Sequence, residues 1–245
     1  MAKQPRKTSK SRQDTKDMQL SPMGLLEIAE HEGVVLGPYL DSVGYWTYGV
    51  GHTASAGPPD SSDMPRVDTR NWSDERVEQQ LVHALKVFDA DLEKFETRVR
   101  KYITSPLHQY EFDALVSFDF NTGGLRYKRK GRYVYAKLTD AINADDMSGD
   151  QFMGWVKPKE IIGRRKSEQA LFRTGDYAAN GTTIPLYDAL GDGRIRRRGT
   201  IDGTRLQELM GGDRKTVDAG TLKAVDEFNA KVKAERKSFW ERLFG

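Results

Sequence analysis

Apolar residues recur at intervals of three and four from Ser73 onward, which is the spacing of an amphipathic helix. The apolar positions of this segment are Val77, Leu81, Leu85, Phe88, Leu92, Phe95 and Val99. Asp74 and Glu75 fall in the expected first turn, where negative charge stabilises a helix N-terminus. The pattern therefore predicts one long helix, which would link two lobes of the fold.

A shorter helix is predicted before it. Ser21 suits the N-cap and Pro22 suits the first helical position, and apolar residues follow on one face. Gly33 comes directly after Glu32 and is a fitting C-terminal stop, so this helix would end on a carboxylate. Periodicity and capping residues predict further helices over residues 105–121, 133–143, 149–155, 160–174 and 221–244.

The remaining segments lack helical periodicity. Residues 37–53 alternate turn residues with aromatic and β-branched residues, as a small β-hairpin does. Ser, Gly, Pro and Asp dominate residues 54–70, which predicts a loop. Residues 177–212 contain many Gly and Asp residues and are expected to be extended or loop-rich.

Four parts of the chain follow from these patterns. We expect a basic flexible tail over residues 1–20 and a folded domain over residues 21–177. A loop-rich extension over residues 178–220 and a C-terminal amphipathic helix over residues 221–245 would follow. Of the 245 residues, 37% are hydrophobic and 31% are charged. This length and composition suffice for one domain of about 150–180 residues with extensions.

Charge is distributed unevenly along a chain whose formal net charge is only +3. Residues 1–17 carry six Lys and Arg residues against two Asp residues. Two further basic clusters are Arg126, Lys128, Arg129, Lys130 and Arg132, and Arg194, Arg196, Arg197 and Arg198. Such patches favour anionic partners, although a merely solvated loop is an equal alternative for residues 126–132. The absence of cysteine excludes a disulfide framework and a zinc–thiolate site.

Two carboxylates and one hydroxyl lie close together in the sequence. Glu32 ends a helix, and Asp41 and Thr47 fall on the predicted hairpin. Glycoside hydrolysis requires two carboxylates facing one cleft, of which one protonates the leaving oxygen and the other acts on water or on the developing positive charge. Burial at the end of an apolar helix would keep Glu32 protonated, whereas Asp41 would stay ionised and Thr47 would hold the water. The alternative is that Glu32 caps a helix and Asp41 makes a turn.

The order of these residues is Glu, eight residues, Asp, five residues and Thr, followed by Tyr48-Gly49-Val50-Gly51-His52. This run resembles the active-site segment of phage-type lysozymes, the muramidases of glycoside hydrolase family 24, and the likeness extends over residues 22–177. The resemblance implies a predominantly helical α+β fold, in which a small β-hairpin lobe and a helical lobe are joined by a long helix. It also implies an inverting hydrolase of the β-1,4 bond between N-acetylmuramic acid and N-acetylglucosamine, without a metal or cofactor.

The resemblance also implies roles for four other residues. His52 would form an interior ion pair with Asp91 and stabilise the fold, rather than act as a general base. Phe120 would pack against a sugar ring and Asn121 would bind an N-acetyl group. The alternative for Asn121 is a simple helix end capped by the Asn-Thr-Gly sequence.

The expected partner is bacterial peptidoglycan. Residues 1–20 and 178–245 are candidates for contacts with other phage structural proteins, and no nucleic-acid partner is expected. The N-terminus has no apolar run typical of a secretory signal, and no stretch approaches the roughly 18–20 apolar residues of a membrane span. We therefore expect synthesis in the host cytoplasm, followed by release through a holin as an endolysin or by carriage in the phage particle. A catalytically silent lysozyme-like module of a particle, structural or wall-binding, is the alternative.

Overall fold

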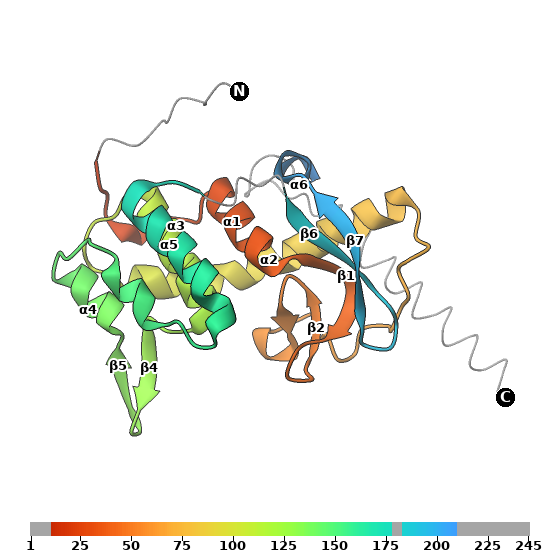
Figure 1. Cartoon of the computed structure of the whole chain (residues 1–245), viewed down its shortest axis with the longest axis horizontal. Helices are drawn as coiled ribbons and strands as arrows, with labels where there is room; N and C mark the ends of the chain where they lie inside the picture. The colour runs from red at the N-terminus through yellow and green to blue at the C-terminus, as the bar shows by residue number, and fades with distance from the viewer. Residues whose placement is uncertain (1–10, 178–182, 210–245) are drawn as a thin grey trace. The chain divides into compact units, whose positions relative to one another are not determined.

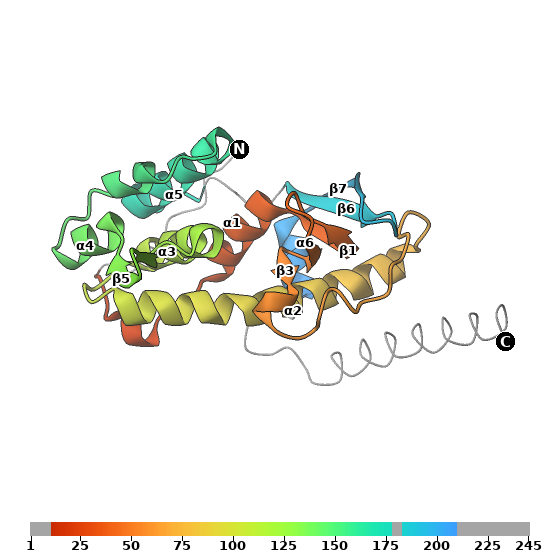
Figure 2. The same cartoon turned by 90° about the horizontal axis from the view of Figure 1, so that it is seen from below.

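The computed structural model describes residues 11–177 and 183–209. They form two compact units, which we call the helical unit (residues 11–28 and 92–177) and the sheet unit (residues 29–91 and 183–209). The longest helix, α2 (Asp74–Tyr102), contributes its first part to the sheet unit and its last part to the helical unit (Figures 1 and 2). The predicted α+β, predominantly helical fold with a small hairpin and a long helix is confirmed.

The sheet unit is built on five strands in the order β3-β2-β1-β6-β7. These strands are β1 (Val34–Leu40), β2 (Trp46–Gly49), β3 (His52–Thr53), β6 (Ile184–Ala189) and β7 (Ile195–Ile201). β1 runs antiparallel to β2 and parallel to β6, and β6 and β7 form an antiparallel hairpin. The predicted hairpin at residues 37–53 is therefore part of a larger sheet, and the short helix η2 (Ala54–Ala56) follows it.

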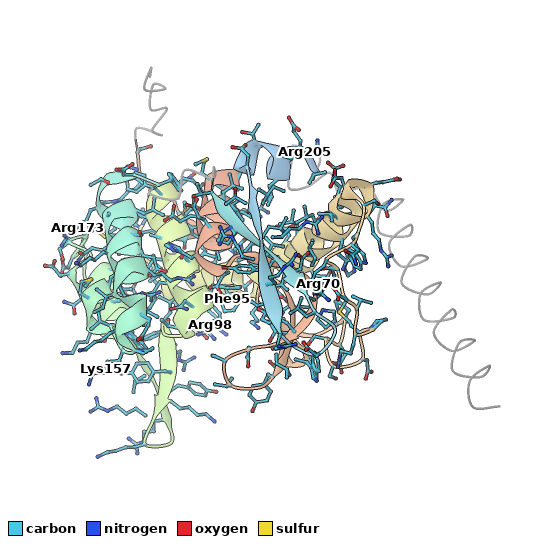
Figure 3. All side chains as sticks on the ribbon, turned by 45° about the vertical axis from the view of Figure 1, so that its right-hand side comes forward. Arg70, Phe95, Arg98, Lys157, Arg173 and Arg205 are labelled. Atoms are coloured by element: carbon cyan, nitrogen blue, oxygen red, sulfur yellow. The ribbon has the colours of Figure 1, made fainter. Side chains whose placement is uncertain are left out.

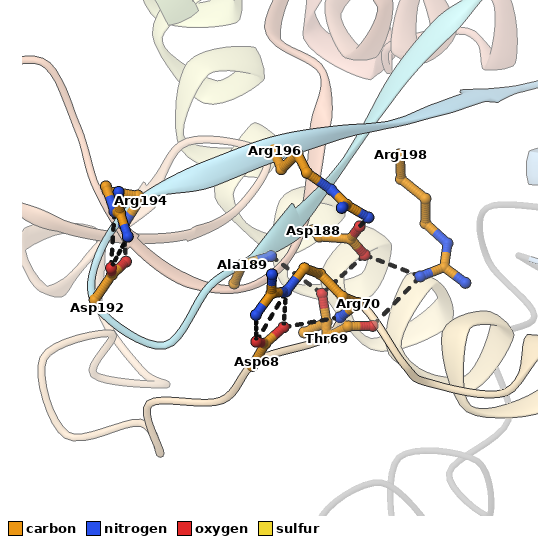
Figure 4. Close-up of polar contacts among 9 residues, drawn as sticks. All are labelled: Asp68, Thr69, Arg70, Asp188, Ala189, Asp192, Arg194, Arg196 and Arg198. Carbon is orange, nitrogen blue, oxygen red and sulfur yellow. Dashed lines mark hydrogen bonds and ion pairs between the residues drawn. The ribbon is translucent and has the colours of Figure 1, made fainter.

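Strands β6 and β7 occupy most of the described part of residues 178–220, for which the sequence predicts an extended or loop-rich structure. Asp188 on β6 is fully buried and binds two arginines of β7, Arg196 and Arg198 (Figure 4). Successive arginines on β7 hide the alternation of apolar and polar residues by which a strand is recognised. The chain then continues into α6 (Gly203–Leu209). Outside the described residues lie segments 178–182 and 210–245, and with them the predicted C-terminal helix.

The first part of α2 packs against β2. Tyr48 on β2 is fully buried, and its hydroxyl is 2.6 Å from both Gln80 Nε2 and His83 Nδ1. Because these contacts satisfy the hydroxyl, burying it costs little. Other buried side chains of this unit are Val34, Leu36, Leu81, Leu85 and Phe88.

The helical unit is organised around α3 (Gln109–Thr122) and α5 (Ile162–Thr174). Phe152, in the short helix η3 (Asp150–Gly154), contacts Phe118 of α3 and Phe172 of α5, with ring centroids 5.4 and 5.5 Å apart. The other elements are η1 (Thr15–Asp17), the first part of α1 (Pro22–Glu32), β4 (Arg126–Arg129), β5 (Arg132–Tyr135), α4 (Lys137–Asn143) and η4 (Lys159–Ile161).

The basic segment of the helical unit differs from its prediction. Residues 126–132, expected to be a loop, and the first residues of the helix predicted at 133–143 form the β4–β5 hairpin. Helix α4 consequently begins only at Lys137. Cations occupy both faces of β4, so the apolar–polar alternation of a strand is absent from the sequence.

Residues 11–20 correct the prediction of a flexible tail. Gln13 pairs with Leu107 through two backbone hydrogen bonds of 2.9 Å, and Arg12 binds the Glu111 carboxylate at 2.9 Å. Two apolar side chains of the same segment are buried as well. These contacts fix the segment on the helical unit, whereas the first ten residues lie outside the described part of the chain.

Candidate active site

Glu32 is the last residue of α1. The helix ends there because Gly33 adopts a left-handed conformation (φ +75°), in which its amide donates to the Ala29 carbonyl at 2.8 Å. A Cβ atom on Gly33 would lie 2.8 Å from the ring of Tyr187 on β6, so a larger residue would disturb this contact. The Glu32 side chain is half-buried at this junction between helix and strand.

The side chain of Asp41 closes the turn between β1 and β2. Its Oδ1 accepts hydrogen bonds from the amides of Val43 (2.9 Å) and Tyr45 (2.8 Å). Nothing within the described part of the chain hydrogen-bonds Oδ2. One oxygen therefore makes the turn and the other is available to a ligand, so the turn-forming role and a chemical role are compatible.

Thr47 lies directly across the hairpin from Tyr39. Cross-strand partners point to the same face of a sheet, so Tyr39 and Thr47 share a face, and Asp41 follows directly after β1 ends. The Thr47 hydroxyl donates to the Tyr45 carbonyl at 3.1 Å, and the residue is only 3% exposed. The hydroxyl oxygen keeps lone pairs with which it can accept a hydrogen bond from water.

The Tyr39 phenol is sensitive to the charges of both carboxylates. Burial raises the pKa of Tyr39, and the negative charges of Glu32 and Asp41 raise it further, to about 12. The charges of both carboxylates therefore reach the Tyr39 hydroxyl. Sequence reasoning does not identify Tyr39, although it lies only two residues before Asp41.

His52 lies between two hydrogen-bond acceptors in the interior of the sheet unit, where it is 1% exposed. Its Nδ1 is 2.8 Å from Asp91 Oδ2, and its Nε2 is 2.7 Å from the Pro59 carbonyl oxygen. Burial lowers the pKa of His52, but the hydrogen bonds to Asp91 and Pro59 and the Asp91 charge outweigh burial and raise the pKa above its ordinary 6.5. Because both ring nitrogens face acceptors, neither is placed to act as a general base.

Phe120 and Asn121 belong to the helical unit and lie near the end of α3. The Phe120 ring meets that of Phe95 edge-on, with centroids 5.1 Å apart (Figure 3 labels Phe95). Asn121 is exposed, and its Oδ1 accepts a hydrogen bond of 2.8 Å from the buried Arg165. That bond orients the amide so that its NH2 group remains to donate to a ligand.

Arg164 and Arg165 of α5 both bind Glu168. Each guanidinium lies 3.0 Å from Glu168 Oε1, and the Ser117 hydroxyl donates to the same oxygen at 2.8 Å. Burial raises the pKa of Glu168, and the two arginines oppose that shift. Arg165 thus joins the buried Glu168 to the exposed Asn121 and holds the latter in place.

The candidate active site of the sheet unit comprises Glu32, Tyr39, Asp41 and Thr47. In the part of the chain that the structure describes, no group of three or more His, Asp and Glu side chains is arranged to hold a metal ion. None of the helices described there is both long and apolar enough to cross a membrane.

Three comparisons relate the chain to known proteins. A family model described as phage lysozyme matches residues 29–170, and therefore ends before β6 and β7. The endolysin of Salmonella phage P22 is 30% identical over 162 residues, which cover 63% of this chain and 98% of that protein. The endolysin of Acyrthosiphon pisum secondary endosymbiont phage 1 is 29% identical over 168 residues, which cover 64% and 99%. Among solved structures, the endolysin from Escherichia coli O157:H7 phage FAHEc1 superposes with a TM-score of 0.50 at 28% identity, covering 66% of this chain and 97% of that one.

Proposed function

Since the chain belongs to the phage lysozyme family, we propose that it is a peptidoglycan hydrolase that cuts the β-1,4 bond between N-acetylmuramic acid and N-acetylglucosamine. The observation that supports this best is the pair of carboxylates, Glu32 and Asp41, whose charges both act on the Tyr39 phenol. Two carboxylates that flank one glycosidic bond are the arrangement on which glycoside hydrolysis depends.

The proposed mechanism assigns one role to each polar group. Glu32 gives its proton to the glycosidic oxygen as the bond from that oxygen to the anomeric carbon breaks. A water molecule held by the Thr47 hydroxyl attacks the anomeric carbon from the opposite face and loses its proton to Asp41. Asp41 also stabilises the positive charge that develops on the sugar ring. Attack by water on the opposite face inverts the anomeric configuration.

Sugar contacts in the helical unit are assigned to Phe120 and Asn121. An aromatic ring packs on the apolar face of a sugar, and an amide NH2 donates to the carbonyl of an N-acetyl group. The hydrogen bond from Arg165 supports this role of Asn121, because it leaves the NH2 group as the free end of the amide.

The two relatives reported above are named endolysins, which favours an endolysin role for this chain as well. In that setting the chain is made in the host cytoplasm, passes through a holin and acts on the wall from within. Mass spectrometry of purified phage particles distinguishes this setting from carriage in the particle, in which the chain would be found there in stoichiometric amounts.

Analysis of the cleavage products tests the proposed bond. Purified peptidoglycan is digested, and the new reducing ends are reduced with borohydride before acid hydrolysis. We expect muramitol as the reduced sugar, and NMR of the fresh digest should give the inverted anomer first. Glucosaminitol would identify cleavage of the other glycosidic bond, and intact strands would identify a catalytically silent module.

The β6–β7 hairpin supports the end of β1 that carries Asp41. The Leu40 amide donates to the Gly193 carbonyl at 2.8 Å. Gly193 has φ +92°, and a Cβ atom there would lie 2.8 Å from Leu40 Cδ1. Because Leu40 directly precedes Asp41, any displacement of Leu40 moves the catalytic turn.

Replacing Gly193 with alanine is therefore expected to lower kcat for wall hydrolysis by about tenfold, because a misplaced catalytic group loses rate steeply. The left-handed backbone adds a stability loss of about 1–2 kcal/mol. Gly199→Ala on the same strand is the matched control, since no atom lies within 4 Å of its Cβ position. Kinetics on purified walls, with a thermal melt of each variant, measure both effects. Equal kcat values for the two variants would contradict a supporting role for Gly193.

A further inference from the structure

The β4–β5 hairpin carries positive charge that the described part of the chain does not neutralise. Its cations are Arg126, Lys128, Arg129, Lys130 and Arg132, and the sequence has no Asp or Glu between Asp119 and Asp140. None of the five forms an ion pair with a residue that the structure describes. Several arginines on other elements form such ion pairs. Three of them, labelled in Figure 3, pair as follows: Arg98 with Asp119, Arg173 with Asp150 and Arg205 with Glu78.

One face of this hairpin interleaves cations with tyrosine rings. Arg126 lies opposite Tyr135, and Lys128 lies opposite Tyr133. The Arg126 guanidinium is 5.0 Å from the ring centroid of Tyr133 and 5.6 Å from that of Tyr135, and Lys128 Nζ is 5.2 Å from that of Tyr133. The cations contact the rings, yet Tyr133 and Tyr135 remain 59% and 44% exposed, so the face offers positive charge together with amphipathic rings.

The other face of the hairpin anchors it to the helical unit. Tyr127 meets Trp155 edge-on, with centroids 5.7 Å apart, and Trp155 meets Phe118 in the same way at 5.8 Å. The Ala136 amide donates to the Leu125 carbonyl at 3.0 Å. The hairpin thus has a fixed base, and its tip projects away from the helices of that unit (Figure 1).

A lysine occupies an unfavourable backbone position at this tip. The two turn residues, Lys130 and Gly131, have φ angles of +50° and +79°. Such a turn strongly prefers asparagine followed by glycine, because a side chain such as that of lysine rarely adopts the left-handed region. The most protruding residue of the hairpin is therefore charged although the backbone would favour asparagine.

We propose that the β4–β5 hairpin binds the phosphate head groups of an anionic lipid bilayer. Cations without counter-charges are attracted to a negatively charged membrane surface, and exposed tyrosines suit the boundary between head groups and water. The convex tip fits a plane. A single-stranded nucleic acid is instead bound along a positively charged groove, whereas these cations lie on a projecting two-stranded hairpin (Figure 1).

Vesicle binding by the full chain tests this proposal. Co-sedimentation is measured with vesicles of phosphatidylglycerol and phosphatidylcholine, and with phosphatidylcholine alone. We expect the triple change Arg129→Gln, Lys130→Asn and Arg132→Gln to weaken binding to the anionic vesicles about 100-fold at low salt, which is roughly fivefold per charge. Lys130→Asn alone should weaken binding about fivefold while leaving the melting temperature equal or higher, since asparagine fits the turn.

The control variant has the same net charge but replaces three paired arginines, in the changes Arg173→Gln, Arg194→Gln and Arg205→Gln. It is expected to keep its affinity for anionic vesicles within about threefold. Both triple variants should hydrolyse purified peptidoglycan at the parental rate, so failure of this proposal is separable from failure of the proposed enzyme activity. The proposal is overturned if the control loses as much affinity as the hairpin variant, or if the hairpin variant still binds. It is also overturned if the hairpin variant loses binding only to DNA or to purified wall polymer.

Discussion

Replacing Glu32 with glutamine is expected to lower the rate of peptidoglycan hydrolysis about 10²–10⁴-fold, the usual contribution of a general acid. Glutamine has nearly the shape of glutamate but cannot give a proton to the leaving oxygen. Since Glu32 is only half-buried at a helix end, the fold should persist, with a melting temperature within about 2 °C of the parent. Turbidity loss of purified walls measures the rate, and a thermal melt checks the fold.

Glu30→Gln is the matched control for this experiment. Glu30 lies two residues earlier on α1, and its Oε1 accepts a hydrogen bond of 2.6 Å from Thr183 Oγ1, which a glutamine oxygen can also accept. The control should retain activity within about twofold. Near-parental hydrolysis by Glu32→Gln, or an equal loss in Glu30→Gln, would reject Glu32 as the acid.

The Tyr39 phenol provides a readout that does not depend on turnover. Its pKa of about 12 reflects burial first and then the charges of Glu32 and Asp41. Glu32→Gln and Asp41→Asn should each lower the pKa of Tyr39, because each removes one charge that repels the phenolate. NMR titration with labelled tyrosine can follow the change. If either substitution leaves the pKa of Tyr39 unchanged, that carboxylate does not face the phenol and the proposed site loses its geometric basis.

Local rules explain which parts of the site can be predicted from the sequence. The stop of α1 at Gly33 and the hairpin that carries Asp41 and Thr47 depend on neighbouring residues alone. Tyr39 lies two residues before Asp41, at the end of β1, so its nearness to the turn also follows from the sequence. The sequence does not predict that burial and the charges of Glu32 and Asp41 raise the pKa of this phenol, because the Glu32 charge acts on it only where the end of α1 lies near β1 in the fold.

Long-range pairing explains what the sequence does not reveal. β6 lies beside β1 although most of the chain separates them, and their pairing leaves no local pattern. On β7 the arginines Arg196 and Arg198 are paired with Asp188 of the neighbouring strand, so a highly charged segment without strand periodicity is nevertheless a strand. The basic β4 is misread for the same reason, because cations replace the apolar residues on which strand recognition relies.

Replacing Asp91 with alanine is expected to lower the free energy of unfolding by about 3 kcal/mol, because it leaves a buried imidazolium without its counter-charge. The His52 side chain is 1% exposed and that of Asp91 12%, so water can compensate little. For a chain of this size the melting temperature should fall by roughly 6–12 °C. Turnover measured well below the melt should change far less. Glu93→Ala, an exposed acid on the same helix, is the control and should cost under about 0.5 kcal/mol.

The stabilisation of the fold by the His52–Asp91 pair should decrease as the pH rises. The folded-state pKa of His52 is raised above 6.5, its ordinary value in an unfolded chain, so the stabilisation is fully present below pH 6.5 and is lost as the pH rises through the raised pKa. Asp91→Asn keeps an acceptor oxygen but removes the charge. The difference in unfolding free energy between the parent and Asp91→Asn should therefore be largest at mildly acidic pH and shrink above it. Urea unfolding at several pH values measures this difference. A constant difference, or one that widens toward alkaline pH, would mean that His52 is neutral in the folded protein and that its contact with Asp91 is not an ion pair.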